Sequence, residues 1–334
     1  MYEETLALRS VLNPRYLAAQ LSGQYDLGPW SECVYWLRGL NDTYRVRAES
    51  GLYILRIYRT EIAEADVAYE TEMLIQLTTL LQGAGTAVAE PIAMRDGGWY
   101  TILDAPEGRR AAVLFRYMDL PENGLMDEAS CFAFGKSAAE LHAAMDNVKL
   151  WQPRMLLDTD FLIEKPLQRI IHHIGKEHKA VPFLRRFARE LHTRVSEAAE
   201  QGLDWGLCHG DMHGNNNAFQ NSSGFVHYDF EWAVPGWRAY DLAQVRVRKR
   251  QPEANQELLW QAVLAGYRSI RDFSKYDEAA VELFTVVRRW WVMGLDVMFV
   301  PNDMGALDYG EDWLRVFLEE FKSTEMTAKA GLKD

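Results

Sequence analysis

The chain has 334 residues, of which 48% are apolar and 25% charged, and its formal net charge at pH 7 is −12. This length and apolar fraction are sufficient for one large domain or two modest lobes with a buried core. An acidic chain lacks the basic surface that general nucleic-acid binding or attachment to an anionic membrane requires, so neither class of partner is expected.

The first 120 residues have the pattern of a small mixed lobe. Stretches rich in β-branched and aromatic residues predict three consecutive strands, and apolar residues at three- and four-residue spacing predict the helix that follows. Two further strand patterns flank a polar turn at 107–110. The predicted strands cover 33–38, 43–48, 52–58, 99–103 and 111–118, and the helix covers 61–82.

Beyond residue 121 the pattern changes to long amphipathic helices with one polar interruption. The predicted helices cover 127–145, 182–199, 256–270 and 279–298, and the interruption covers 207–241. Because strand signals end where a turn of Pro, Glu, Asn and Gly begins, we place a lobe boundary there. The predicted lobes are 1–120 and 121–334.

Cysteine usage and the N-terminal residues bear on location. Cys33, Cys131 and Cys208 are far apart and form no CxxC pair, which favours neither a disulfide framework nor a zinc knuckle. The first residues lack a basic segment followed by an apolar one, and no apolar run approaches the roughly 20 residues of a membrane span. We therefore expect a cytoplasmic protein.

The polar interruption carries three residue types that phosphoryl transfer requires. That chemistry needs a carboxylate to orient the attacking hydroxyl and oxygen ligands to hold magnesium against the nucleotide phosphates. Asp211 is followed five positions later by Asn216, and Asp229 follows a short apolar strand pattern. Asp211 is thus the candidate base, and Asn216 and Asp229 are the candidate metal ligands.

The same interruption resembles a known family. The segment HGDMHGNNN at 209–217 resembles the HGDxHxxN loop of the aminoglycoside phosphotransferase and choline kinase-like family. The segment GWRAYDLA at 236–243 is similar to a segment of that family that ends in Asp-Leu-Ala. The resemblance extends over about residues 31–248.

The resemblance implies an α+β, bilobal protein-kinase-like fold. A small antiparallel β-sheet N-lobe with one helix, at 1–120, would bind the nucleotide and end in a hinge. A larger, mainly helical C-lobe, at 121–334, would carry catalysis and the acceptor. The resemblance also implies that Asp211 is the base, that His209 orients the loop and that Asp241 braces it.

The resemblance also implies which residues contact the nucleotide, and this chain departs from the family at one of them. The third strand of the family carries a basic residue, typically Lys, that contacts the phosphates, and Arg56 stands there in this chain. Arg can also grip phosphate, although its fork differs in geometry from the ammonium of Lys. Its expected partner on the next helix is Glu70, which has the better register, or Glu72.

Two further nucleotide contacts are expected. The loop that covers the nucleotide contains Gly39 and Asn41 and is poor in glycine. The hinge is expected at Tyr117 and Met118, where backbone groups would hydrogen-bond the adenine edge.

Other polar residues have two interpretations. His213 is expected to hydrogen-bond within the loop. Glu231 is two positions after Asp229, and on a strand the two would share a face, so Glu231 is either a further metal-associated acid or a solvated carboxylate. The segment Arg288 to Trp291 lies on a helix and is either core or a platform for the substrate.

These residues predict an enzyme that transfers the γ-phosphate of ATP, with Mg²⁺, to a hydroxyl of a small molecule. An aminoglycoside, an amino alcohol, choline and homoserine are the candidate acceptors, and the acidic balance favours a cationic one. A Ser/Thr protein kinase of the same fold and a catalytically silent nucleotide-binding module are rivals. A metal-dependent hydrolase using His209, Asp211 and His213 is another.

Overall fold

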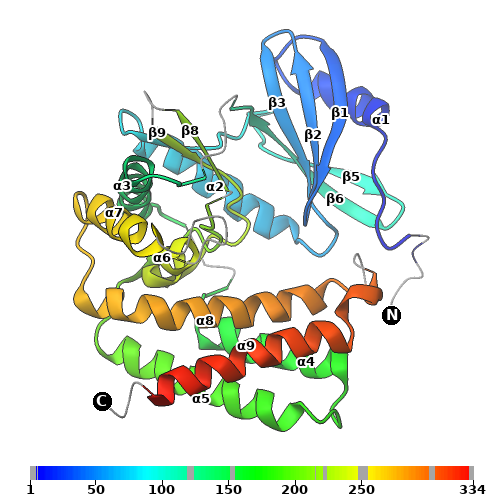
Figure 1. The fold of residues 1–334 in the computed structure, drawn as a ribbon. Helices are drawn as coiled ribbons and strands as arrows, with labels where there is room; N and C mark the ends of the chain where they lie inside the picture. The colour runs from blue at the N-terminus through cyan, green and yellow to red at the C-terminus, as the bar shows by residue number, and fades with distance from the viewer. Residues whose placement is uncertain are drawn as a thin grey trace. The chain divides into compact units, whose positions relative to one another are not determined.

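The computed structural model describes residues 5, 7–118, 124–150, 155–214, 216–220, 224–246, 255–300 and 305–330, with only the backbone of 220 and 325–330. Residues 119–123, where we placed the lobe boundary, lie outside this part of the chain. Strands and helices alternate in the first half, and helices prevail in the second (Figure 1).

The described residues contain the following elements. The strands are β1 (Trp30–Arg38), β2 (Asp42–Ala48), β3 (Gly51–Ile57), β4 (Thr86–Val88), β5 (Thr101–Ala105), β6 (Gly108–Arg116), β7 (Trp205–Leu207), β8 (Asn217–Gln220), β9 (Gly224–His227) and β10 (Pro235–Trp237). The helices are α1 (Pro14–Leu21), α2 (Glu64–Leu80), α3 (Glu128–Met145), α4 (Lys165–Ile174), α5 (Val181–Glu200), α6 (Arg238–Arg246), α7 (Gln256–Arg268), α8 (Lys275–Met298) and α9 (Glu311–Ala330). Short helical turns are η1 (Ser22–Gln24), η2 (Asp160–Glu164) and η4 (Ala306–Tyr309).

The internal contacts divide the chain into two compact units, each made of three segments. The first unit comprises Met1–Arg154, Gly214–Ala233 and Glu257–Arg271, and the second comprises Met155–His213, Val234–Gln256 and Asp272–Asp334. The predicted lobes 1–120 and 121–334 stay a prediction about the functional division of the chain.

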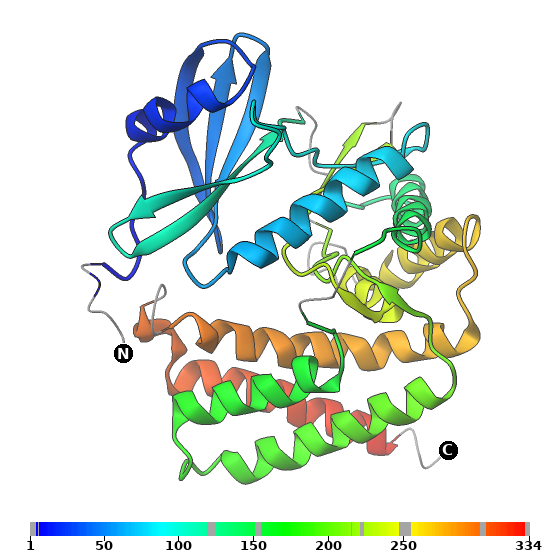
Figure 2. The same ribbon diagram turned by 180° about the vertical axis from the view of Figure 1, so that it is seen from behind.

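The first unit contains a five-stranded antiparallel sheet in the order β1-β2-β3-β6-β5. All five strands were predicted, and alternating residues such as Tyr44 and Val46 point into one core. Helix α1, which was not predicted, lies against a face of this sheet (Figures 1 and 2). It buries Leu17 and Leu21 in the same core.

A second, three-stranded sheet in the first unit has the order β4-β9-β8. The short apolar strand pattern before Asp229 corresponds to β9, whereas β4 was not predicted, because three residues are too short for a periodic signal. β4 pairs in parallel with β9, and α3 packs on β9, where Phe134 and Phe225 meet edge to face at 5.3 Å. The hairpin of β8 and β9 fixes the positions of the residues that flank it, Asn216 and Asp229.

Helices α3 and α7 cross so closely that each requires a glycine. A Cβ atom on Gly135 would overlap the carbonyl of Val263, and one on Gly266 would overlap the carbonyl of Phe132. Because the obstacle is backbone, Gly135→Ala should lower the free energy of unfolding by about 3 kcal/mol. Thermal or urea unfolding would measure this loss. Gly23→Ala is the control, since no atom lies within 4 Å of the added methyl group, and equal effects of the two changes would contradict the close crossing.

In the second unit, helices α4, α5, α6 and α9 pack around α8 (Figure 1). Trp290 and Trp291 on α8 are buried, and the indole N–H of Trp290 donates to the carbonyl of Ile163 at 3.0 Å. The two tryptophans therefore belong to the core and are not an exposed substrate platform. Neither α4 nor α9 was predicted.

Helix α8 begins at Lys275, four residues before the predicted start at 279. Ser274 caps it: its side chain accepts from the amide of Asp277, and the carboxylate of Asp277 accepts from Ser274. The Ser-x-x-Asp spacing is a capping signal that the apolar periodicity does not contain. Within the described residues, no helix combines the length and the apolar character needed to cross a membrane.

Candidate active site

The backbone of the loop after β7 is held in place by hydrogen bonds with side chains of α6. Asp241, which is buried, accepts hydrogen bonds from the backbone amides of His209 (2.6 Å) and Gly210 (2.8 Å). The side-chain amide of Gln244 donates to the carbonyl of Gly210 at 3.1 Å. Gly210 has a φ of +78°, a left-handed conformation that favours glycine. These bonds are the contacts that a brace of the loop requires.

His209 lies inside the loop and is fully buried. Its Nδ1 accepts a hydrogen bond from the amide of Asp211 at 3.3 Å. The ring thus helps to fix the backbone direction from which the Asp211 side chain leaves the loop. This geometry is that of a residue that orients the loop.

The Asp211 carboxylate is bound by two basic side chains. Its Oδ1 forms an ion pair with Nη2 of Arg288, and its Oδ2 lies 3.4 Å from Nε2 of His213. Burial by itself raises the pKa of this carboxyl group, but the charges of Arg288, His213 and His209 outweigh burial and hold the pKa below its ordinary value. Asp211 is therefore ionised at neutral pH, as a hydrogen-bond acceptor for a hydroxyl must be.

Arg288 is a site residue whose role was not predicted. Its guanidinium extends from α8, lies 4.5 Å above the Trp291 ring, and also contacts the Tyr240 hydroxyl (3.2 Å) and the Gly210 carbonyl (3.4 Å). Burial by itself lowers the pKa of this guanidinium. The interactions with Tyr240 and Asp211 raise the pKa by more than burial lowers it, so the group stays charged. The signal in the sequence was a pair of arginines, Arg288 and Arg289, directly before two tryptophans on a predicted helix.

In the first unit, Arg56 of β3 lies between two carboxylates. Its Nη1 is 3.3 Å from Oε1 of Glu70 on α2 and 3.2 Å from Oδ1 of Asp229. Of the two glutamates left open by the sequence, Glu70 is thus the partner of Arg56, and Glu72 is exposed. The guanidinium also lies 5.5 Å from the centre of the Phe115 ring. Arg56 therefore joins α2 to the Asp229 segment.

Glu70 is a titratable group in this cluster. Burial raises its pKa to about 7, although the charge of Arg56 and a hydrogen bond from the Tyr58 hydroxyl (2.9 Å) act in the opposite direction. The ion pair of Arg56 with Glu70 is consequently sensitive to pH near neutrality.

The surroundings of Glu231 are neither the strand nor the solvent that the sequence suggested. It does not lie on a strand with Asp229, since β9 ends at His227 and Asp229 has a left-handed φ of +69°. Glu231 is also not solvated: it is buried, forms an ion pair with Arg59 and accepts from the side-chain amide of Asn41. The solvated interpretation was wrong because 190 residues separate Glu231 from Asn41 in the sequence.

Asn41 was predicted to contact the nucleotide and is engaged within the protein. Its side-chain oxygen accepts from the amide of Arg59 at 3.1 Å, while its side-chain nitrogen binds Glu231. A nucleotide contact at this position would therefore come from the backbone of the loop. Asn41 connects the β1–β2 loop to the segment after Asp229.

The predicted hinge follows β6. The amide of Tyr117 donates to the carbonyl of Leu52 at 3.2 Å, and both Tyr117 and Met118 are half-buried. If this segment binds adenine, the hydrogen bonds would come from the Tyr117 carbonyl and the Met118 backbone. That role stays a prediction.

Asn216 and Asp229 fit a magnesium ion by their position and chemistry. The β8–β9 pairing places Asn217 opposite His227, and the Tyr228 amide donates to the Asn216 carbonyl at 3.1 Å. The two candidate ligands thus flank the same end of one hairpin. An amide oxygen and a carboxylate are the hard donors that Mg²⁺ prefers, and the Asp229 side chain is 39% exposed.

A braced carboxylate, a hairpin flanked by an amide and a carboxylate, and a sheet that carries a basic residue are together typical of one class of proteins: phosphotransferases with a kinase-like fold. Comparison with known proteins agrees. The model of the Phosphotransferase enzyme family matches residues 38–279. The chain therefore belongs to this family, and the predicted α+β protein-kinase-like fold is confirmed.

Three similar proteins illustrate the family. An uncharacterized protein of Deinococcus radiodurans is 35% identical over 86% of this chain and 83% of its own length. A homoserine kinase of Xanthobacter autotrophicus is 27% identical over 83% of each chain. The structure of an amicoumacin kinase in complex with AMP-PNP, Ca²⁺ and Ami has a TM-score of 0.70 at 15% identity, covering 95% of this chain and 94% of the other. The predicted enzyme class, an ATP-dependent phosphotransferase acting on an alcohol group, is confirmed.

Proposed function

We propose that Asp211 is the catalytic base that receives a small-molecule hydroxyl for attack on the γ-phosphate of ATP. The observation that supports this role most directly is the position of the Asp211 carboxylate, which Arg288 and His213 contact on a loop that Asp241 braces. The hydroxyl oxygen forms a bond to the γ-phosphorus as the bond to the bridging oxygen of ADP breaks. The hydroxyl proton passes to Asp211, and ADP and a phosphate monoester leave.

The nucleotide and its metal ion would be bound by the cluster around Arg56 and Asp229. We propose that Asn216 and Asp229 hold Mg²⁺, which when bound neutralises charge on the phosphates. Arg56, now paired with Glu70 and Asp229, would turn part of its guanidinium to the phosphates. The Arg59, Glu231 and Asn41 network would keep the covering loop and the Asp229 segment in register.

The acceptor is proposed to be a small hydroxyl compound that carries an amino group. The acidic net charge favours a cationic group, and one relative is named a homoserine kinase. We also propose that the enzyme works in the cytoplasm, where ATP is supplied. The three cysteines, all within the described residues, form no disulfide, which is compatible with a reducing compartment.

The rival hydrolase would need His209, Asp211 and His213 to converge on one metal. Among the described residues, no three His, Cys, Asp or Glu side chains form such a cluster. His209 instead uses Nδ1 for the Asp211 amide. The geometry of this loop therefore favours the phosphotransferase over the hydrolase.

The test is ADP release by the purified chain with ATP and magnesium. The acceptors are aminoglycosides, homoserine, amino alcohols, sugars and a generic protein, and Asp211→Asn is the blank. We expect release that depends on one class of small molecule and is lost in Asp229→Asn. Turnover of a substrate without ATP would favour the hydrolase, phosphorylation of the protein alone would favour a protein kinase, and no release above the blank would favour the silent module.

A further inference from the structure

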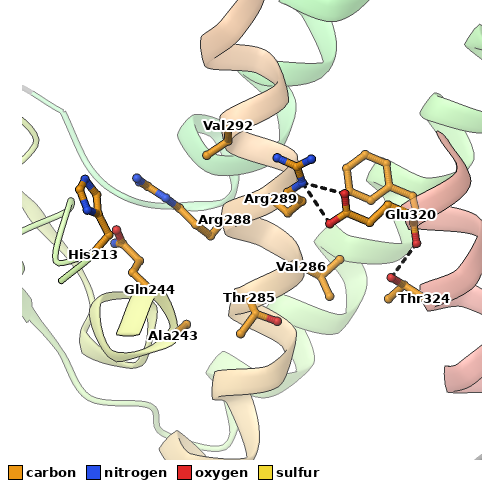
Figure 3. A pocket seen from close by; sticks show the side chains of 11 residues that line it. His213, Ala243, Gln244, Thr285, Val286, Arg288, Arg289, Val292, Glu320 and Thr324 are labelled. Carbon is orange, nitrogen blue, oxygen red and sulfur yellow. Dashed lines mark hydrogen bonds and ion pairs between the residues drawn. The ribbon is translucent and has the colours of Figure 1, made fainter. Parts of the chain in front are cut away.

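A groove in the second unit adjoins the residues that bind Asp211. It has a volume of about 380 Å³ and lies along α8, between α6 and α9. In Figure 3, Arg288 leaves α8 toward His213 and Gln244, and Arg289 leaves it toward Glu320. Thr285 lies one turn earlier on the helix. The side chains at one end of the groove are thus the same two that contact the catalytic carboxylate.

Arg288 lines the groove and also contacts the loop that carries Asp211. Its contacts with Asp211, Tyr240 and Gly210 use Nη1 and Nη2. Within the described part of the chain, its Nε–H takes no part in these contacts. A guanidinium presents five N–H donors in a planar fork, so it can bind a second carboxylate while it keeps the first.

The charges that line the groove are unsuited to a polycation. Glu320 is the one carboxylate among its described lining residues, and Arg289 already binds both of its oxygens at 3.0 and 2.8 Å. The remaining polar lining is basic or neutral, and it includes Arg288 and His213. An ammonium group would find no uncompensated acid here, whereas a carboxylate would find two basic side chains.

We propose that this groove binds a carboxylate of the acceptor, so that the substrate is a short hydroxy acid and not a simple amino alcohol or a polycationic antibiotic. The inference rests on the proposed function of Asp211. It identifies Arg288 as the residue that determines specificity for the negatively charged end of the acceptor.

The geometry also limits the length of the acceptor. Two carboxylates bound to one guanidinium lie only a few ångströms apart. When one is Asp211 and the other belongs to the acceptor, the reacting hydroxyl must be only a few bonds from the acceptor carboxylate. This condition excludes long hydroxy acids and favours chains of about the size of homoserine.

Three compounds that differ by single groups test the inference in the wild-type protein. Homoserine has an amino group and a carboxylate, 3-amino-1-propanol lacks the carboxylate, and 4-hydroxybutyrate lacks the amino group. In the ADP-release assay we expect kcat/KM for homoserine to exceed that for 3-amino-1-propanol at least 100-fold, with 4-hydroxybutyrate above 3-amino-1-propanol. Equal or better use of 3-amino-1-propanol would overturn the inference while leaving the proposed function intact.

A matched pair of variants tests the place of binding. Thr285 is three residues before Arg288 and four before Arg289, so a carboxylate at this position can reach either guanidinium. Thr285→Glu and Thr285→Gln have nearly the same shape and differ in charge. We expect KM for homoserine to be about tenfold higher in the Glu variant than in the Gln variant, with no such increase for 3-amino-1-propanol.

These outcomes distinguish a failure of the proposed function from a failure of carboxylate binding in the groove. If no small molecule gives release above the Asp211→Asn blank, the proposed function itself fails. If homoserine turns over with the same KM in both Thr285 variants, the carboxylate does not bind in this groove. A smaller folded fraction would lower the apparent kcat for both acceptors, and a local distortion would raise KM for both, whereas the inference requires a higher KM for homoserine alone.

Discussion

Asp211→Asn is expected to lower kcat about 10³-fold and to leave the affinity for ATP within about twofold of wild type. The amide has nearly the shape of the carboxylate but cannot accept the proton of the attacking hydroxyl. ATP affinity should persist because the nucleotide is proposed to bind Arg56, Asn216 and Asp229, which are unchanged. Single-turnover ADP release and titration with a non-hydrolysable ATP analogue would measure the two quantities.

The control for this variant is a carboxylate-to-amide change elsewhere. Asp26 is exposed and pairs only at the surface with Arg95, so Asp26→Asn should change neither kcat nor ATP affinity. Thermal unfolding would verify that the Asp211→Asn change has not disturbed the loop. Turnover like that of the wild type in a folded Asp211→Asn preparation would refute the assignment of the base.

Arg288→Gln is expected to lower kcat about 100-fold and to move the acid limb of the pH–rate profile to higher pH. In the wild type, burial opposes ionisation of Asp211, but the charges of Arg288, His213 and His209 overcome it and lower the pKa. Activity is then lost only as the pH falls through that low value. Without Arg288, burial still acts on Asp211, so its pKa rises and the loss occurs at higher pH. A pH–rate profile of kcat/KM would show the shift.

The expected loss of kcat in Arg288→Gln has two causes: the lost charge, and the lost fixation of the Asp211 side chain. The guanidinium also contacts Tyr240 and the Gly210 carbonyl, so its loss would free the Asp211 side chain to change rotamer, and a misplacement of about 1 Å can cost roughly 100-fold in rate. Arg288→Lys keeps the charge and loses the fork. It should retain the wild-type acid limb while kcat still falls.

Stability gives an independent measure of the same pair. Both side chains are mostly buried, so Arg288→Gln alone leaves a buried carboxylate without its main partner and should cost about 3 kcal/mol. Asp211→Asn with Arg288→Gln should cost less than this single change. If Arg288→Gln shifted neither the acid limb nor the stability, Arg288 would have no role in fixing Asp211.

The sequence determined much of this protein because many of its signals are local. Stretches rich in β-branched and aromatic residues, separated by turns, predicted the five strands of the sheet, since such side chains favour the extended backbone. The spacing of Asp211, Asn216 and Asp229 identified the chemistry, since that chemistry needs those residue types on one loop and one hairpin. The helices that were predicted agreed within a few residues, and the start of α8 differs because a cap sets it, whereas the 20-residue helix α9 was missed.

The tertiary structure alone decided the partners. Arg288 meets Asp211 across 77 residues, and Asn41 meets Glu231 across 190. Such pairs depend on how helices and loops pack, and no local period records that packing. For the same reason the sequence left Glu70 and Glu72 open, and only the position of α2 beside β3 selected Glu70. The charge of the groove is likewise set by which side chains α6, α8 and α9 bring together, whereas the net charge of −12 describes the whole surface.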